Sequence, residues 1–159
     1  MATKKVSAGL LMYHRLGGVV QVFLAHPGGP FFARKDDGVW SIPKGEIEGA
    51  DEPVATARRE FEEETGITAE GELVPLGWVR QKGGKVVHAW AFAGALPPGW
   101  VLRSNTFQMQ WPPGSGRVQE FPEIDRAQFF DVEIARRKIL SAQAAFLDRL
   151  LALMGRGAR

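Results

Sequence analysis

Four glutamates crowd into the stretch REFEEETG, residues 59–66. Because successive residues of a helix turn by about 100°, a helix here would bring Glu60, Glu63 and Glu64 onto one face and turn Glu62 away. Like charges at these spacings repel, and negative charge near the C-terminal end of a helix opposes the helix dipole. A divalent cation such as Mg²⁺ or Mn²⁺ would reverse both effects, since it prefers oxygen ligands. The pattern indicates either a metal site or an acidic, solvent-facing helix surface.

The composition limits which other kinds of catalytic, metal-binding or partner-binding site the chain can form. The 159 residues contain no Cys, which excludes disulfides, thiolate ligands and cysteine nucleophiles. The three His residues are not spaced as zinc ligands usually are, which argues against a zinc site. We assign none of them a role. A net charge of +2 is too weak to indicate a nucleic-acid partner. No apolar run approaches the roughly 18 residues of a membrane span, so we expect a cytoplasmic protein without a membrane partner.

The helix that would carry the glutamates has signals at both ends. Asp51 can cap its start, Pro53 is tolerated in the first turn, and Gly66 is well placed just beyond its end. An apolar stripe at helical spacing would face the core. Its members are Val54, Ala57 and Phe61.

The rest of the chain predicts a sheet around this helix. Residues 6–13 and 19–26 flank Gly17-Gly18 and predict one hairpin, and residues 73–81 and 85–96 predict another. We further expect loops at 26–38 and 112–126, short strands at 40–42, 107–111 and 128–132, and helices at 133–140 and after Ser141. The sum is one domain, residues 1–159, of the α/β (α+β) class, with a mixed sheet and flanking helices.

Residues 45–67 resemble the signature of the Nudix hydrolases. That signature is Gly, five residues, Glu, seven residues, then Arg-Glu-apolar-x-Glu-Glu-x-Gly-apolar. The matching residues are Gly45, Arg59, Glu60, Phe61, Glu63, Glu64, Gly66 and Ile67. One position departs, because Asp51 stands where the family usually has its first Glu. We expect metal binding to survive this change with altered surroundings.

The resemblance implies a fold, a cofactor and roles for these residues. It implies an α/β/α sandwich with a mixed central sheet and a loop-helix-loop metal site that binds Mg²⁺ (or Mn²⁺). Glu60, Glu63 and Glu64 would be the metal ligands, together with a backbone carbonyl near Gly45. Arg59 would orient the glutamates through ion pairs, although an ordinary surface salt bridge is the alternative.

Many relatives also place an acidic residue in a later loop, as a ligand or a general base. Glu120 and Glu123, in QEFPEID, are the candidates here. The sequence does not choose between them, and each is equally well explained as surface charge.

The run KDDGVWSIPKGE resembles the segment before this signature in relatives that act on nucleoside triphosphates, diadenosine polyphosphates and diphosphoinositol polyphosphates. Arg34, Lys35 and Lys44 would then face phosphates, with a solvated loop as the alternative for the first two. Trp40 and Phe32 are the candidates for stacking on a base, because they are expected in loops near the signature.

The resulting hypothesis is a Mg²⁺-dependent pyrophosphohydrolase that cleaves a phosphoanhydride bond of a nucleoside triphosphate or dinucleoside polyphosphate. Alternatives are a hydrolase for diphosphoinositol polyphosphates or for a nucleoside diphosphate sugar of the ADP-ribose type, and a Nudix-like module that binds a nucleotide without cleaving it. The retained glutamates favour catalysis. The weak net charge argues against RNA decapping or a stable nucleic-acid complex. The oligomeric state stays open.

Overall fold

The structure, a computed structural model, describes residues 5–157, and side chains as far as residue 155. The expected domain of residues 1–159 extends beyond this range at both ends. The elements in chain order are β1 (Val6–Leu16), β2 (Val19–Pro27), β3 (Lys44–Glu46), α1 (Pro53–Thr65), β4 (Val74–Arg80), β5 (Val86–Ala93), β6 (Thr106–Gln110), β7 (Val118–Pro122), β8 (Ile124–Asp131), α2 (Val132–Lys138), the 3₁₀ turn η1 (Ser141–Gln143) and α3 (Ala144–Gly157).

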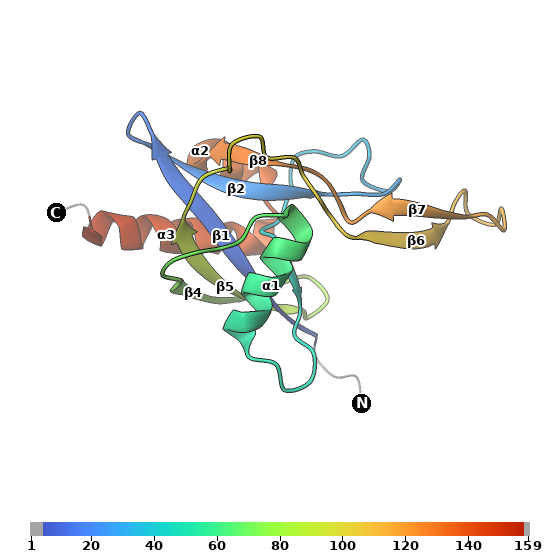
Figure 1. Ribbon diagram of the computed structural model, residues 1–159, viewed down its shortest axis with the longest axis horizontal. Helices are drawn as coiled ribbons and strands as arrows, with labels where there is room; N and C mark the ends of the chain where they lie inside the picture. The colour runs from blue at the N-terminus through green and yellow to red at the C-terminus, as the bar shows by residue number, and fades with distance from the viewer. Residues whose placement is uncertain (1–4, 158–159) are drawn as a thin grey trace.

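A mixed six-stranded sheet forms the centre of the molecule (Figure 1). Its strand order is β4-β5-β1-β2-β8, and the short strand β3 pairs with the first part of β1. The β1–β5 pair is parallel, whereas β1–β2, β2–β8 and β4–β5 are antiparallel. Both predicted hairpins are therefore confirmed, and β1 lies at the middle of the sheet.

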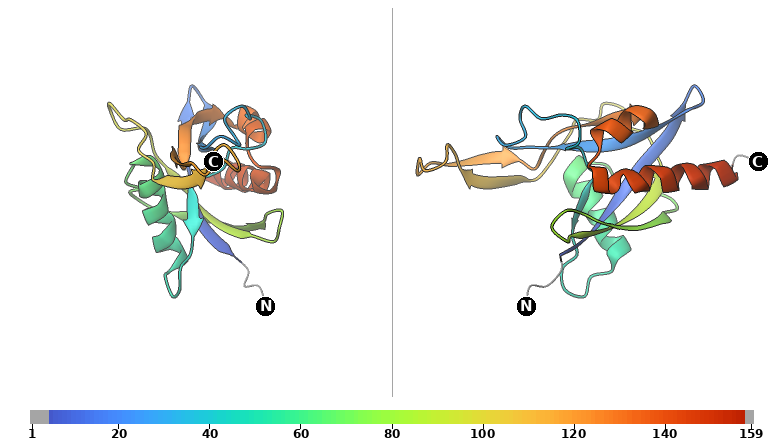
Figure 2. Two further views of the ribbon diagram at one scale, coloured as in Figure 1. Left: turned by 90° about the vertical axis from the view of Figure 1, so that its right-hand side faces the viewer. Right: turned by 180° about the vertical axis from the view of Figure 1, so that it is seen from behind.

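Side chains of β1 alternate between two hydrophobic cores, as the pleat of a strand requires. Leu10 and Met12 pack with Phe23 and Phe61 on the face covered by α1. Leu11 points the other way, into a core that α2 and α3 cover. Figure 2 shows α1 and α3 on opposite sides of the sheet. The α/β/α sandwich expected from the sequence is confirmed.

Helix α1 begins and ends close to the predicted positions. Its N-cap is Glu52 rather than Asp51, and no side chain caps it by a hydrogen bond. The prediction for Asp51 was wrong because this carboxylate pairs with Arg59 on the helix surface instead. Gly66 ends the helix in the left-handed conformation, with φ of 77°, which glycine adopts without strain.

Several boundaries elsewhere differ from the sequence-based expectation. The strand expected at 40–42 consists of isolated bridges, and the regular strand follows it as β3. The loop expected at 112–126 contains β7, which pairs with β6 in a separate two-stranded arm that extends away from the main sheet (Figures 1 and 2). Ser141 begins a 3₁₀ turn and caps no helix. Such short polar strands give no periodic signal strong enough to predict.

None of the helices in the described part of the chain has both the length and the apolar character that a membrane crossing requires.

Candidate active site

The three glutamates on α1 lie at different depths. The Glu63 side chain is 42% exposed and the Glu60 side chain 17%, whereas Glu64 is buried. Glu62 points into solvent, as the helical spacing predicts. The helix therefore presents a graded row of carboxylates that runs from the surface inward.

Arg59 lies among three acids on the outer side of this row. Its guanidinium nitrogens are 3.5 Å from Asp51, 3.7 Å from Glu60 and 3.8 Å from Glu63. This geometry suits the positioning role that the resemblance implies. It also shows what Asp51 contacts: the arginine, across the start of the helix.

Gly45 brings β3 directly against Glu60. A Cβ atom at Gly45 would lie 2.0 Å from the Glu60 carboxyl carbon, so no larger residue fits without displacing that side chain. The backbone of β3 therefore lies directly against the Glu60 side chain.

A cavity of about 260 Å³ opens beside the buried end of this row. Lys44, Glu64 and Glu123 form its polar part. The remaining lining is mostly apolar and consists of Ala25, Pro27, Phe32, Val39, Ser41, Ile42, Pro43, Ile124 and Leu140. A charged group could therefore bind at one end and an apolar or aromatic group at the other.

Burial and mutual repulsion perturb the ionisable groups. Burial, reinforced by the nearby Glu123 and Glu60 carboxylates, raises the pKa of Glu64 to about 9. Burial and the charge of Glu63 raise the pKa of Glu60. Burial also lowers the pKa of Lys44, against the attraction of the neighbouring glutamates. Negative charge is crowded here beyond what Lys44 and Arg59 neutralise.

These residues fit a hard divalent cation. All their side-chain donors are carboxylate oxygens, and the raised pKa values of Glu60 and Glu64 mark carboxylates that are shielded from water and crowded by one another. Within residues 5–157, the side chains as they stand form no ready group of three ligands. Glu60, Glu63 and Glu64 would therefore turn within their rotamers to share an ion, helped by a carbonyl near Gly45.

The structure separates the two later acidic candidates. Glu123 lines the cavity next to Glu64. Glu120 lies on the arm, exposed and opposite Gln108 in the β6–β7 pair. Of these two residues, only Glu123 is thus placed to act with the glutamates of α1.

The residues predicted to bind substrate fall into two groups, those that line the cavity and those that do not. Lys44 and Phe32 line the cavity, whereas Arg34 and Lys35 are exposed on the loop and do not. Trp40 must be corrected, because it is a core residue with 1% exposure and not a loop residue free to stack on a base. Its indole nitrogen donates to Asp36 at 2.8 Å. Sequence reasoning missed Ile124 and Leu140, which reach the cavity from distant parts of the chain and carry no local signal.

Comparison with known proteins agrees with this geometry. A family model described as the NUDIX domain matches residues 3–150. The chain belongs to the Nudix family. This Nudix membership supports a hydrolase that acts on pyrophosphate bonds. The chain is also 33% identical over 102 residues to an octanoyltransferase of Myxococcus xanthus; the match covers 64% of the chain and 25% of that longer protein.

Two solved Nudix structures illustrate the shared fold. An Ap4A hydrolase of Caenorhabditis elegans, as a binary complex, superposes with a TM-score of 0.63 and 22% identity, covering 96% of this chain and 98% of that one. The NUDIX domain of NrtR from Shewanella oneidensis, with ADP ribose, gives a TM-score of 0.68 at 10% identity, covering 97% and 90%. At these identities the likeness extends to the fold alone.

Proposed function

We propose that this Nudix protein is a Mg²⁺- or Mn²⁺-dependent pyrophosphohydrolase for a nucleotide with several phosphates, a nucleoside triphosphate or a dinucleoside polyphosphate. One observation carries the proposal: a lysine and two carboxylates share one end of a half-apolar cavity beside the glutamate row of α1. With a divalent cation bound among these carboxylates, such a cavity suits a ligand with a polyanionic part and a flat apolar part.

The ion, when bound, supplies positive charge that polarises the phosphate and lowers the pKa of a bound water. Glu60, Glu63 and Glu64 hold it, and Arg59 keeps the two outer glutamates in place. Lys44 binds a phosphate oxygen, since it is the cation that faces the cavity. Phe32, which also lines the cavity, gives the nucleobase an aromatic surface.

Glu123 is the proposed general base or additional ligand. It is the acid outside α1 that lines the cavity, and it stands close enough to Glu64 to raise the pKa of that group. A carboxylate in this position can accept a proton from the attacking water.

A substrate panel tests the assignment. Release of phosphate or of nucleoside phosphates is measured with Mg²⁺ for diadenosine tetraphosphate, ATP, dGTP, ADP-ribose and a diphosphoinositol polyphosphate. Faster turnover of the first three supports the proposal. Turnover of ADP-ribose or of the inositol compound alone would reassign the substrate class, and binding without any turnover would point to a non-catalytic module.

Two conservative variants test the metal ligands. Glu63→Gln and Glu64→Gln keep size and hydrogen bonding but remove a charged oxygen. We expect turnover to fall by at least about a thousandfold, with the fold retained in circular dichroism. Glu62→Gln is the matched control, since Glu62 points into solvent. Unchanged activity in the first two variants would contradict the proposal.

A further inference from the structure

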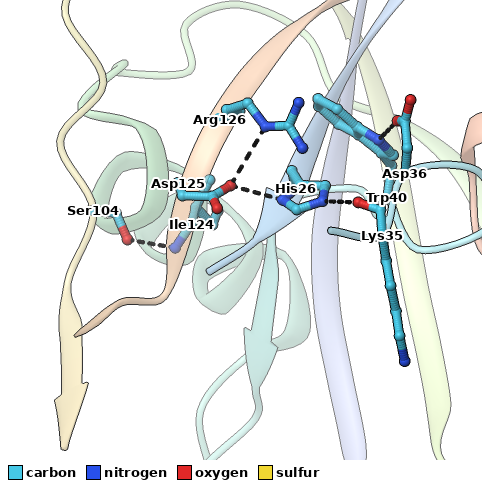
Figure 3. A network of polar contacts seen from close by, with 8 residues as sticks. All are labelled: His26, Lys35, Asp36, Trp40, Ser104, Ile124, Asp125 and Arg126. Atoms are coloured by element: carbon cyan, nitrogen blue, oxygen red, sulfur yellow. Dashed lines mark hydrogen bonds and ion pairs between the residues drawn. The ribbon is translucent and has the colours of Figure 1, made fainter. Parts of the chain in front are cut away.

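His26 is a fully buried histidine with two short polar contacts. Its side chain has 0% exposure near the end of β2. Nδ1 lies 2.7 Å from Oδ1 of Asp125, and Nε2 lies 2.7 Å from the backbone oxygen of Lys35 (Figure 3). The proposed reaction uses neither contact.

Both partners are hydrogen-bond acceptors. A backbone carbonyl only accepts, so Nε2 carries a proton. The approach of Nδ1 to the Asp125 carboxylate, at 2.7 Å, also requires a hydrogen between the two atoms. Through these two hydrogen bonds, the ring joins two segments that are nine and 99 residues away in the sequence.

A break in the strand pairing brings Asp125 to this position. His26 pairs with Arg126, but Pro27 pairs with Ile124, so Asp125 has no partner across the ladder. An extra residue of this kind bends the strand and re-aims a side chain. Here the bulge lets the Asp125 carboxylate reach the ring on the neighbouring strand.

The two segments joined by His26 both contribute to the lining of the cavity. Phe32 lines it from the loop that ends at Lys35, and Ile124 lines it from β8, the strand that contains Asp125, with Glu123 directly before that strand. The buried ring thus helps to fix the position of Phe32 relative to Glu123 and Ile124.

We propose that His26 is a positioning residue, which sets the substrate-binding wall of the cavity by tying the loop of residues 28–35 to β8. The proposal rests on the proposed function for its effect on activity. It is independent of that function for its effect on the loop.

The loop side depends on His26 more than the strand side does. Among the described residues, the hydrogen bond at Lys35 is the one hydrogen bond that ties residues 29–35 to the rest of the protein, beside the edge-on contact of the Phe31 and Trp111 rings, whose centroids are 5.4 Å apart. By contrast, Ile124 is held by Ser104 at 2.9 Å, and Glu123 is held by Asn105 and Gly28 at 2.8 and 2.9 Å. Loss of His26 therefore loosens Phe32 and leaves Glu123 in place.

The test uses His26→Phe and Asp125→Ala in the full chain, with diadenosine tetraphosphate and Mg²⁺ as the probe. We expect KM to rise about tenfold and kcat to stay within about threefold, because binding is weakened and the reacting groups keep their places. Asp125→Asn keeps an oxygen that accepts from Nδ1, and we expect it to restore most of the wild-type KM. Equal effects of Asn and Ala at this position would overturn the proposal.

His14→Phe is the matched control. His14 also makes one short side-chain contact, to Gln21 at 2.7 Å, and stacks on Phe129, but it lies outside the cavity lining. We expect both kinetic constants to stay within about twofold. A KM effect as large as that of His26→Phe would show that any lost histidine disturbs binding, and the proposal would fail.

Two measurements do not depend on turnover. Nitrogen-15 NMR of the wild-type chain should show Nε2 of His26 protonated, because the Lys35 carbonyl can only accept a hydrogen bond, and an unprotonated Nε2 would overturn the proposal. In His26→Phe, amide exchange at Phe32 and Lys35 should quicken at least about tenfold while the Leu10 amide in β1 is unchanged. Unchanged exchange at Phe32 and Lys35 would also overturn it.

These arms keep the two proposals apart. If the wild-type chain cleaves no nucleotide, the proposed function fails, and NMR and exchange still decide the role of His26. If His26→Phe does not fold, the Asp125→Ala and Asp125→Asn pair decides it through KM and through the same amides.

Discussion

The two walls of the cavity are built in different ways. One wall is formed by α1 and β3, which are near in sequence. The backbone of β3 at Gly45 lies directly against the side chain of Glu60 on α1. On the other wall, the loop after β2 faces the start of β8, about a hundred residues later, and they are joined by the buried ring of His26 and by the hydrogen bond that the Gly28 N–H donates to the Glu123 carbonyl.

This difference separates two tasks. The first wall holds the groups proposed for the metal, which need fixed geometry whatever the substrate. The second wall holds groups proposed for substrate contact, such as Phe32, and a loop held by few bonds can vary in shape. We expect mutations of the groups proposed for the metal to lower kcat and mutations of the loop in the second wall to raise KM, whereas Glu123, directly before β8, is a proposed reacting group and its loss should lower kcat.

The sharpest break of the first wall is Gly45→Ala. The added Cβ would lie 2.0 Å from the carboxyl carbon of Glu60 and would force it aside. We expect a hundredfold or larger loss of kcat, since small misplacements of reacting groups have effects of that size, and a loss of about 1–3 kcal/mol in the free energy of unfolding. Steady-state kinetics and urea unfolding measure both.

Gly155→Ala is the control, because nothing lies within 4 Å of a Cβ there. Alanine favours a helix by up to about 1 kcal/mol over glycine, so stability should rise slightly and activity should not change. Normal kcat in Gly45→Ala would show that the contact with Glu60 does not matter.

A matched pair of glutamates gives the next largest effect. Glu123 lines the cavity and Glu120 lies exposed on the arm, three residues away. We expect Glu123→Gln to lower kcat by roughly tenfold to a hundredfold and Glu120→Gln to leave it within twofold. The reverse order, measured at saturating substrate, would move the proposed base to the arm.

The sequence predicted the first wall and little of the second. The spacing within residues 59–66 predicts a helix that turns Glu62 away into solvent, as the structure shows, because a helix converts spacing into direction without help from other segments. The shared metal site of Glu60, Glu63 and Glu64 stays a prediction. Gly45 was also found, since the resemblance includes it. These features are local, and the family signature spans them.

The second wall depends on contacts over long sequence separations. Sequence reasoning assigned His26 no role and Trp40 the wrong role. Contacts with residues far along the chain decide how these two side chains lie: His26 bonds to Asp125, and Trp40 packs against Phe130. The bulge that places Asp125 is an irregularity in strand pairing, and no periodic pattern announces it. Tertiary packing, rather than residue type, decides which aromatic lines the cavity.

Phe32→Ala tests the second wall directly. It removes the aromatic ring from the cavity lining, and we expect KM for a nucleotide substrate to rise about tenfold with kcat little changed, the range that loss of base stacking gives. Arg34→Ala, on the same loop but outside the lining, should change KM less than threefold. A fall in kcat without a change in KM would remove Phe32 from the substrate wall.

The smallest expected effect concerns stability and pH. The pKa of Glu64 is about 9 in the folded metal-free chain, above its ordinary value of 4.5. The folded state therefore keeps a proton that the unfolded state has lost between these values, and stability falls as pH rises through this window. Glu64→Gln cannot lose that proton. Without metal, we expect its Tm to exceed that of the wild type by a few degrees at pH 8.5 and to match it near pH 4.5.

Added Mg²⁺ should reverse this order at pH 8.5, because a bound ion stabilises the wild-type carboxylate. Differential scanning calorimetry measures both conditions. Identical pH profiles for the two proteins would mean that Glu64 is ionised throughout and is not crowded by its neighbours.

The two-stranded arm offers a practical handle on the molecule. Its turn, around Gly114 and Gly116, is exposed and lies at the far end of β6 and β7 from the sheet (Figure 1). Exposed turns of small residues tolerate substitutions and added groups well. A cysteine at Ser115 would be unique in a chain that has none, so one fluorophore could be attached there to follow nucleotide binding in solution without occupying the cavity.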